Sequence, residues 1–519
     1  VDLLIPTYNE PVEILRKTLL CASEIKWKNL TINILDDGNR PEVKSLAKEL
    51  DVRYFFRTTN SGAKAGNMNA ALGALTGEYV AILDADFLSL RNFIEKAIPQ
   101  FSDPRVGCVQ FPQTFYNADP TQINSELFHK FQNEQWNWFH KVLPIRDQSD
   151  LATSCGSCSV VRRASLELIG GKFPEDTITE DFDLSLRLLD VGQITRYKNE
   201  TVAIGLHAKS VNDFFKQRKR WAIGNISAFR LSLLRSGKLN FLNKILIFEW
   251  RAISLPARLI TLFAPASVFL LDVWPLRANS LIEYLLFTAP MILVIANNEI
   301  NSVALSFRNL VSNHSRTVGL AISLGLEIFI SFIKPQKLKF NVTAKSSTLQ
   351  SQKNPYRIII IFVLLVSATS LTVGIIKYTT GGNELSTDVS LLWQIWNLFL
   401  IFGALQMFSD RELKRKNERL QPNSAMNCKI FSVEKIFIET GVIQDISESG
   451  LQILTTKPVL DSIVYIELPK MMIESRVIAC HSTSAGQWLV RFDFSKQQSA
   501  HDELIKFIYT GDFTPEINI

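Results

Sequence analysis

Two long apolar runs without a charged residue constrain this chain most. "IIIIFVLLVSATSLTVGII", within 357–376, and "VSLLWQIWNLFLIFGALQMF", at 389–408, are both about as long as a helix that crosses a bilayer, which needs about 20 mainly apolar residues. Two weaker candidates, 253–274 and 279–297, include Arg258 and Glu283, respectively. A fifth run, 317–333, is short and contains Glu327, so we interpret it as lying in the membrane interface. The chain therefore contacts a lipid bilayer.

The charges of the loops orient these spans. The segment 334–357 holds six basic residues and no acidic one, and 411–419 is strongly basic, whereas the loops at 272–278 and 377–388 are short and not basic. Basic loops stay on the cytoplasmic side. An even number of crossings then leaves the first and last parts of the chain in the cytosol. We expect a multi-pass protein of the cytoplasmic (inner) membrane.

The remaining residues divide into two soluble parts. Residues 1–240 predict an α/β domain, 241–408 hold the transmembrane and interfacial helices, and 409–519 return to a mixed polar pattern. The chain opens directly in a predicted strand, with no signal peptide before it, and we interpret it as a fragment that lacks an N-terminal part. A formal net charge of +6 over 519 residues does not suggest a nucleic acid polymer as partner.

The cysteines predict free thiols, because most of the six lie in parts assigned to the cytosol. Cys155 and Cys158 have the spacing of a redox or zinc motif, but no second pair completes a tetrahedral site.

In the first part, short apolar runs that end in polar clusters alternate with helical patterns. The runs "VDLLIPTYNEP", "TINILDDG", "VRYFFR" and "YVAILDAD" predict a parallel sheet with crossover helices. Ligands of such sheets bind beyond the carboxyl ends of the strands. The residues expected at those ends include Tyr8, Glu10, Asp37, Asp84 and Asp86.

Asp84 and Asp86 are the sharpest signal in this group. Two carboxylates spaced i, i+2 at a strand end can hold a divalent cation together with a substrate diphosphate, although Asp is also common in turns. Lys64, in "SGAKAGNMNAAL", is available for phosphate groups.

The segment "TITEDFDLSLRLLDVG" predicts an amphipathic helix that starts near Glu180. Asp181 could be a general base that removes a proton from an attacking hydroxyl. Alternatively, Thr179 or Asp181 could cap the helix.

The stretch "QRKRWAIGN" comes just before the membrane part. Arg220 can grip a diphosphate with its planar guanidinium, and Trp221 offers a flat face for a sugar ring. Gln217 can donate and accept hydrogen bonds with hydroxyls. A solvated interfacial helix is the alternative.

These motifs in order, YNE, DDG, AKAGN, DAD, TED and QRKRW, resemble the processive, inverting family 2 glycosyltransferases, above all the bacterial cellulose synthases. The resemblance implies a GT-A-like domain that extends a growing β-1,4-glucan from UDP-glucose and exports it, with a periplasmic or membrane subunit as a further partner. Asp37, Asp84 and Asp86 would bind UDP and Mg²⁺ (or Mn²⁺), Glu180 would be among the substrate-binding residues, and Asp181 would be the base. Tyr8 and Glu10 would line the uridine pocket, and Lys64 would face the phosphates.

Polar and aromatic residues inside the last span, Trp393, Trp396 and Asn397, suit the wall of a sugar channel. They equally suit packing between helices or anchoring at the interface.

The basic segment 334–357 contains "KLKFNVTAKSS". Its residues Phe340, Val342, Thr343 and Lys345 resemble the gating loop of this family, which implies a mobile loop over the active site. Ser346 stands where the family has a glycine. A basic loop that touches anionic headgroups is the other interpretation.

The last part predicts a small β-barrel from several short alternating runs. Asp445, Ser447 and Gly450, after a run of arginines, resemble the PilZ domain, which implies binding of cyclic di-GMP as an allosteric activator. The pairs Arg411/Arg415 and Arg415/Arg419 both fit the arginine spacing, and we favour Arg415 with Arg419. The rivals to this function are a related polysaccharide synthase and a degenerate transferase kept as a cyclic di-GMP-binding receptor.

Overall fold

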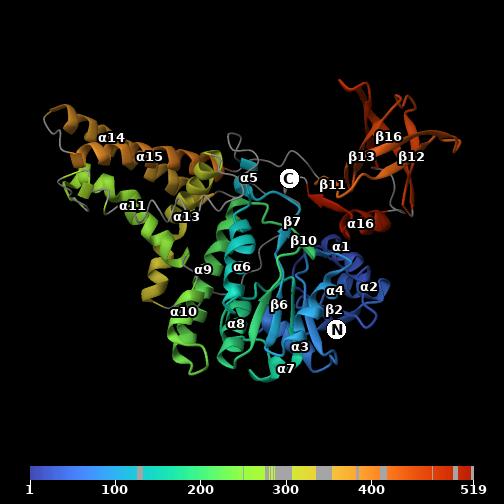
Figure 1. The fold of residues 1–519 in the computed structure, drawn as a ribbon, viewed down its shortest axis with the longest axis horizontal. Helices are drawn as coiled ribbons and strands as arrows, with labels where there is room; N and C mark the ends of the chain where they lie inside the picture. Colours follow the sequence, from blue (N-terminus) through green and yellow to red (C-terminus); the bar gives the residue numbers. More distant parts are fainter. Residues whose placement is uncertain are drawn as a thin grey trace.

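The computed structural model describes three parts in succession (Figure 1). The described residues are 1–124, 132–248, 251–274, 280, 282–283, 286, 307–334, 354–380, 385–409, 418–469, 471–494 and 501–515. An α/β domain lies at the centre of the view, long helices extend to its left, and a β-barrel lies to its right.

The α/β domain is built on one seven-stranded sheet in the order β3-β2-β1-β4-β8-β6-β9. Its strands are β1 (Asp2–Thr7), β2 (Thr31–Asp36), β3 (Arg53–Phe56), β4 (Tyr79–Ile82), β6 (Val106–Gln110), β8 (Ser159–Arg162) and β9 (Ile194–Tyr197). The four predicted strands at the start of the chain are confirmed as β1 to β4, and they pair in parallel. The sheet is nevertheless mixed, because β8 runs antiparallel to both β4 and β6.

Strand β1 lies near the middle of the sheet, between β2 and β4. Its residues Leu3, Leu4 and Ile5 are fully buried, as expected for a strand covered on both faces. Since β2, β1 and β4 are parallel neighbours, their carboxyl ends share one edge. That edge carries the polar residues that follow each strand: Tyr8 after β1, Asp37 after β2 and Asp84 after β4.

The helices around this sheet are α1 (Val12–Ser23), α2 (Pro41–Glu49), α3 (Ala63–Leu72), α4 (Phe93–Ala97), α5 (Pro120–Asn124), α6 (Leu143–Gln148), α7 (Arg163–Glu167), α8 (Glu180–Asp190), α9 (Val211–Leu234) and α10 (Phe241–Ile247). Short 3-10 and π turns occupy Ile98–Ser102 and Trp138–Val142. A second sheet beside the first consists of β5 (Phe87–Ser89), β10 (Ala203–Gly205) and β7 (Thr114–Phe115).

Helix α9 carries the QRKRW residues and comes very close to the start of α8. A Cβ placed on Gly224 would lie 2.6 Å from Thr179 Cγ2 and 2.9 Å from Ile178 Cγ1. Only a residue without a side chain lets the two helices approach this far. Gly224 therefore brings α9 against the TED segment.

We expect Gly224→Ala to destabilise the protein by about 1–3 kcal/mol, because the added methyl has no room. The measurement is the thermal unfolding midpoint in detergent, which should fall. Gly73→Ala is the matched control, since a Cβ at Gly73 meets no atom within 4 Å. Equal midpoints for the two variants would contradict the close approach.

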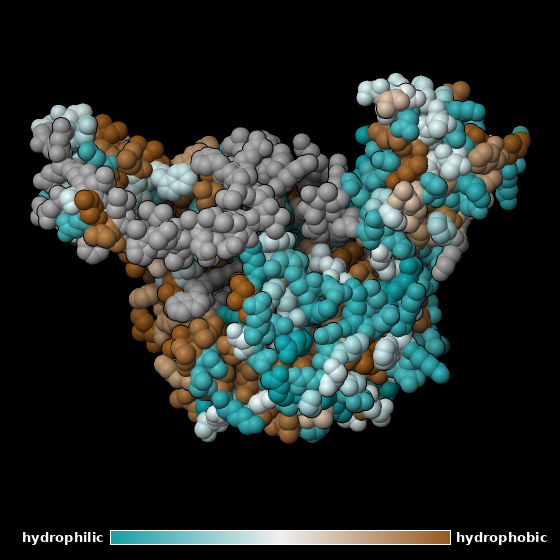
Figure 2. Space-filling view, in the orientation of Figure 1, coloured by the Kyte–Doolittle hydropathy of each residue, from teal (hydrophilic) through white to brown (hydrophobic). Residues whose placement is uncertain are grey.

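Four described helices are long and apolar enough to cross a membrane: Ile253–Leu271 in α11 (Arg251–Leu271), Leu310–Ile333 in α13 (Phe307–Ile333), the whole of α14 (Pro355–Thr380), and Thr387–Met407 in α15 (Leu385–Met407). Brown, apolar surface gathers over this part of the molecule, whereas teal dominates the visible face of the α/β domain (Figure 2). The predicted spans 253–274, 357–376 and 389–408 are confirmed as apolar helices. The predicted span 279–297 lies almost entirely outside the described residues.

Helix α13 differs from its prediction in length. The sequence suggested a short element at 317–333, but the helix begins ten residues earlier, so its apolar segment reaches 24 residues. It also holds an ion pair with α9, in which Lys219 Nζ lies 2.8 Å from Glu327 Oε2 and the Glu327 side chain is 46% exposed. A partly exposed ion pair fits the membrane interface better than hydrocarbon.

Polar side chains in α15 serve helix packing. Asn397 is buried and donates to the backbone carbonyl of Leu262 in α11, and buried Gln394 donates to that of Ser367 in α14. For Asn397 the structure thus favours the predicted packing role over a channel wall.

The last part is a closed barrel of six strands, because β12, β15, β16, β17, β14 and β13 pair in sequence and β13 pairs again with β12. The elements of this part are β11 (Leu420–Pro422), β12 (Asn427–Phe431), β13 (Phe437–Ser447), β14 (Gly450–Thr455), β15 (Ile463–Leu468), β16 (Met471–Ser482), β17 (Trp488–Asp493), α16 (His501–Tyr509) and β18 (Phe513–Pro515). Alternate residues of β14 are buried, as in a barrel wall. The predicted β-barrel is confirmed.

The barrel part is docked on the α/β domain through α16, which lies against α1 (Figure 1). Ion pairs join Lys17 Nζ to Glu448 Oε1 at 2.5 Å and Arg16 to Asp502 at 2.8 Å. The Tyr509 hydroxyl donates to the same Glu448 oxygen, 2.7 Å away. Glu448 stands between Ser447 and Gly450, so the predicted ligand motif of the barrel adjoins the first domain.

Candidate active site

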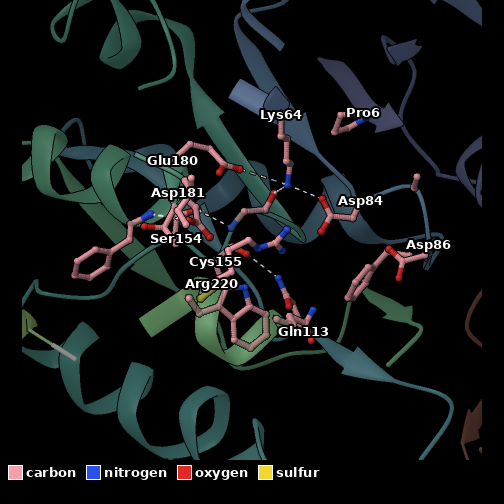
Figure 3. A pocket seen from close by; sticks show the side chains of 18 of the residues that line it. Pro6, Lys64, Asp84, Asp86, Gln113, Ser154, Cys155, Glu180, Asp181 and Arg220 are labelled. Carbon is pink, nitrogen blue, oxygen red and sulfur yellow. Dashed lines mark hydrogen bonds and ion pairs between the residues drawn. The ribbon is translucent and has the colours of Figure 1, made fainter. Parts of the chain in front are cut away.

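One cleft collects every predicted substrate residue of the first part. It opens at the carboxyl ends of β1, β2 and β4, and α9 closes one side (Figure 3). The predicted residues that line it are Tyr8, Glu10, Asp37, Lys64, Asp84, Asp86, Glu180, Asp181, Gln217, Arg220 and Trp221. The first and the last of these residues, Tyr8 and Trp221, are more than 200 positions apart in the sequence, and the fold brings them into one cleft.

Lys64 stands between the DAD and TED motifs (Figure 3). Its ammonium lies 2.5 Å from Asp84 Oδ1 and 3.8 Å from Glu180 Oε1, and it donates to the Gly156 carbonyl at 2.7 Å. Burial alone would lower the pKa of Lys64, but Asp84 and Glu180 outweigh it and raise the pKa above its ordinary value. Lys64 is therefore a fixed positive charge in the cleft.

Asp84 and Asp86 differ in exposure. The Asp84 side chain is 35% exposed to the cleft, whereas Asp86 is 2% exposed. Among the described residues no three His, Cys, Asp or Glu side chains form a metal cage. Magnesium often takes only one or two carboxylates and completes its shell with substrate phosphates and water. Asp84 and Asp86 both line the cleft, so two carboxylates are present there.

Asp37 has a partner that the sequence did not point to. Arg57 donates to both of its carboxylate oxygens, through Nε and through NH2, the latter at 2.8 Å. Arg57 also donates to the carbonyls of Ser61 and Ala63, just before Lys64. It thus ties the end of β2 to the start of α3. Only the three-dimensional pairing reveals Arg57, since no motif contains it.

Asp181 lies in the first turn of α8 and faces the cleft. Thr179 is the N-cap residue of this helix, but its side chain makes no capping bond, and Asp181 Oδ1 accepts from the adjacent Phe182 N–H at 2.9 Å. The predicted alternative of a Thr179 side-chain cap is wrong. Burial and the neighbouring Glu180 raise the pKa of Asp181 to about 7, against the opposing effect of Lys64. A carboxylate with such a pKa is suited to accept a proton near neutral pH.

The loop "SCGSC" forms the floor beneath Lys64 and Asp181. Gly156 has a φ of +81°, and a Cβ there would lie 3.0 Å from Asp181 Oδ2 and 3.3 Å from Lys64 Nζ. All six cysteines are free, as predicted. Cys155 accepts a bond from the Trp138 indole, and Cys158 is fully buried. Cys155 and Cys158 are thus free thiols that pack against their neighbours in this loop.

The QRKRW residues approach the cleft from α9. Burial lowers the pKa of Arg220 despite the nearby carboxylates of Glu180, Asp84 and Asp181, and the guanidinium keeps its charge. Arg220 therefore faces the same acidic group as Lys64 from the opposite side (Figure 3). Trp221 and Gln217 line the cleft beside it.

The described residues of the barrel motif make two polar contacts. Arg419 donates to Asp445 Oδ2 at 3.0 Å, and Ser447 Oγ lies 3.3 Å from the Gly450 carbonyl. A Cβ on Gly450 would clash with the Phe492 carbonyl. The predicted arginines 411 and 415 and the predicted gating residues 340, 342, 343 and 345 lie outside the described residues.

Known proteins similar to this chain include glycosyltransferases. Residues 2–170 match the model of glycosyl transferase family 2. A UDP-forming cellulose synthase catalytic subunit of Xanthomonas axonopodis pv. citri is 33% identical over 439 residues, which cover 81% of this chain and 59% of the relative. The subunit of the same name from Pseudomonas fluorescens is 28% identical over 472 residues, covering 88% and 62%.

The chain thus spans about three fifths of the length of these curated relatives. Among solved structures, a mannosyltransferase of Pyrobaculum calidifontis in complex with GDP-Man and Mn²⁺ has 19% identity and a TM-score of 0.45, covering 65% of this chain and 87% of that one. Over most of its length this chain is therefore similar to bacterial cellulose synthase catalytic subunits, and its residues 2–170 match the family 2 glycosyl transferases.

Proposed function

We propose that this protein transfers glucose from UDP-glucose to the end of a β-1,4-glucan, processively and with inversion, and passes the polymer across the membrane. The observation that carries the proposal is one cleft in which Asp181, Lys64 and Arg220 surround the end of the sheet, beside helices long enough to cross a bilayer. A general base and two cations that face a departing diphosphate are what such a reaction needs.

Asp181 is the base in this scheme. It takes the proton of the acceptor's terminal hydroxyl while the oxygen attacks C1 of the donor sugar, and the bond from C1 to UDP breaks on the opposite face. The configuration at C1 is thereby inverted. The proton remains on the Asp181 carboxyl until water removes it. The raised pKa of Asp181 supports this role.

The departing UDP gains negative charge, which Lys64 and Arg220 meet from two sides. Asp84 and Asp86 would hold the Mg²⁺ or Mn²⁺ ion, which neutralises charge on the diphosphate. Tyr8, Glu10 and Asp37 line the part of the cleft assigned to uridine. Glu10 also accepts from Thr7 Oγ1 and the Tyr8 N–H, which fixes the loop after β1.

The growing chain occupies the side of the cleft formed by α9. Trp221 stacks on the terminal sugar, and Gln217 bonds its hydroxyls. Helix α9 packs on α13 and α11, so the acceptor side adjoins the apolar helices. The α/β domain and the barrel lie in the cytosol of a cell with this protein in its inner membrane, and an export subunit receives the glucan beyond it.

Activity should depend on pH through Asp181. A base must be deprotonated, so kcat/KM is expected to fall about tenfold per pH unit below the pKa of about 7 and to level off above it. Because Glu180 helps to raise that pKa, Glu180→Gln should move the inflection to lower pH. The measurement is the pH profile of initial rates. An inflection unmoved by Glu180→Gln would contradict this assignment.

The barrel is proposed to be a PilZ domain that binds cyclic di-GMP through Arg415, Arg419, Asp445, Ser447 and Gly450. The bound dinucleotide would release the gating loop around Phe340, Val342, Thr343 and Lys345. The contact between Arg419 and Asp445 supports this proposal, since it sets a cation beside the predicted turn.

Arg419→Ala is therefore expected to weaken cyclic di-GMP binding at least about tenfold, because an arginine–phosphate contact is lost. Titration calorimetry on the full chain measures it. Lys429→Ala, which removes an exposed cation of β12 that pairs with Glu467, is the control. Unchanged affinity in Arg419→Ala would contradict the assigned ligand site.

The donor is tested with purified protein in lipid vesicles, Mg²⁺ and cyclic di-GMP. UDP-glucose, UDP-N-acetylglucosamine and UDP-galactose are supplied separately, and sugar incorporated into insoluble polymer is counted. The proposal expects incorporation from UDP-glucose. Incorporation from another donor alone would favour a related synthase, and cyclic di-GMP binding without incorporation from any donor would favour a degenerate receptor.

A further inference from the structure

Arg218 is a buried cation in the QRKRW stretch, next to the cleft, and the proposed reaction gives it no role. It stands between Gln217 and Arg220 on α9, but its own side chain is only 6% exposed, and it is not among the residues that line the cleft. A buried charge is costly unless it is paired and hydrogen-bonded, so its contacts indicate what it is for.

All three nitrogens of the Arg218 guanidinium are engaged. Nε and NH2 donate to Glu134 Oε2, at 3.1 and 2.9 Å, and NH1 donates to Gln217 Oε1 at 2.5 Å. The planar group also lies over two rings, 4.1 Å from the centroid of Phe214 and 4.6 Å from that of Trp221. One buried side chain thus contacts both residues that are proposed to hold the acceptor.

Glu134 anchors this arrangement from the other side. It is 9% exposed, and its backbone N–H lies 3.3 Å from Asp119 Oδ2. Asp119 in turn is 3.8 Å from Arg316 NH1 on α13, and both side chains are buried. Arg218 is therefore fixed to Glu134 and, through Asp119 and Arg316, to the apolar helix α13.

Packing alone does not explain this choice of residue. An apolar side chain would fill the space between Phe214 and Trp221 without the cost of a buried ion pair. What an arginine adds is direction: the guanidinium bonds the Gln217 amide oxygen and holds the Trp221 ring against one face, while Glu134 fixes the plane. Both Gln217 and Trp221 present their remaining surface to the cleft.

We propose that Arg218, held by Glu134, is a positioning residue that orients Gln217 and Trp221 toward the acceptor sugar. The inference rests on the proposed function of the cleft and deepens it. Arg218 touches neither substrate. It aligns the acceptor end of the site and leaves the donor end, at Lys64 and Arg220, unaffected.

The test compares Arg218→Lys with Lys219→Arg in the vesicle assay. Lysine keeps a charge for Glu134 but lacks the planar fork that reaches Gln217 and covers Trp221 together. The control changes the neighbouring lysine to arginine. Lys219 forms a partly exposed ion pair with Glu327. The two readouts are the KM for UDP-glucose and the glucose incorporated per UDP released.

In Arg218→Lys we expect the KM to stay within about twofold and the incorporated glucose per UDP to fall about tenfold, because a misaligned acceptor lets water take the donor sugar. Lys219→Arg should match the wild type. Glu134→Gln, which removes the anchoring charge from the other side, should shift the same ratio in the same direction. If Arg218→Lys does not fold, the Glu134→Gln variant tests the positioning role of Arg218 instead.

Each outcome has a distinct meaning. If the wild-type protein makes polymer and the ratio is unchanged in Arg218→Lys, or in Glu134→Gln where the first does not fold, Arg218 does not position the acceptor. A parallel loss of both UDP release and incorporation, with the ratio constant, would make Arg218 a purely structural residue and overturn the inference. If the wild-type protein makes no polymer, the proposed function fails, and the inference falls with it.

Discussion

Replacing Asp181 by asparagine is expected to lower the rate of sugar transfer about 1000-fold, the scale of a lost general base. The amide has the shape of the carboxyl but cannot take the acceptor's proton. Its environment argues for the large effect: burial and Glu180 raise the pKa of Asp181, so this carboxylate holds a proton more readily than an exposed one. Initial rates of UDP release and of polymer formation measure the loss.

Asp176→Asn is the matched control for this prediction. Asp176 lies just before the same helix, is 62% exposed and pairs with Arg187, so its loss should leave the rate unchanged. Cyclic di-GMP binding should also be the same in wild type and Asp181→Asn, because the barrel is not altered. Synthesis at the wild-type rate in Asp181→Asn would show that another group is the base.

The second large effect is expected at Arg220. Arg220→Met should reduce transfer about 100-fold, the range seen when one group that stabilises developing charge is removed. The guanidinium faces Asp84, Asp181 and Glu180 across the cleft, so its loss leaves the diphosphate beside those carboxylates with less opposing charge. Arg220→Lys should restore only part of the rate, because an ammonium cannot bind two oxygens in a plane.

Lys216→Met is the control on the same helix, since Lys216 is 56% exposed and is not among the residues that line the cleft. The decisive measurement is kcat together with the KM for UDP-glucose. If Arg220→Met and Lys216→Met behave alike, Arg220 does not face the leaving group.

Much of the fold follows from local patterns. Strands β1, β2 and β4 are apolar runs that end in polar residues, and α14 and α15 are uncharged over the length of a membrane span, so both classes were predictable. The antiparallel strand β8 was not, because its direction depends on pairing with β4 and β6, which are distant in sequence. Helix α13 was underestimated, since its first turns carry polar residues that hide the start of the apolar segment.

The candidate site divides in the same way. Asp84, Asp181 and Arg220 belong to motifs with recognisable spacing, and the structure brings them into one cleft. Arg57 and Glu134 belong to none, because their importance lies in ion pairs with residues 20 and 84 positions away. Such pairs exist only once the chain has folded, so single-sequence patterns do not reveal them.

The contact between the barrel and the first domain was equally hidden. Lys17 and Tyr509 meet at Glu448, inside the predicted ligand motif, although the three residues are far apart in sequence. This arrangement docks the barrel on α1 of the transferase domain.

The linkage of the product tests the central claim most directly. Polymer made from UDP-glucose by the purified chain in vesicles is treated with a β-1,4-specific glucanase, and the soluble sugars are measured. The proposal predicts complete digestion to short β-1,4-linked glucose oligomers, with no polymer from Asp181→Asn. A polymer that resists this enzyme, or that forms equally well with Asp181→Asn, would contradict it.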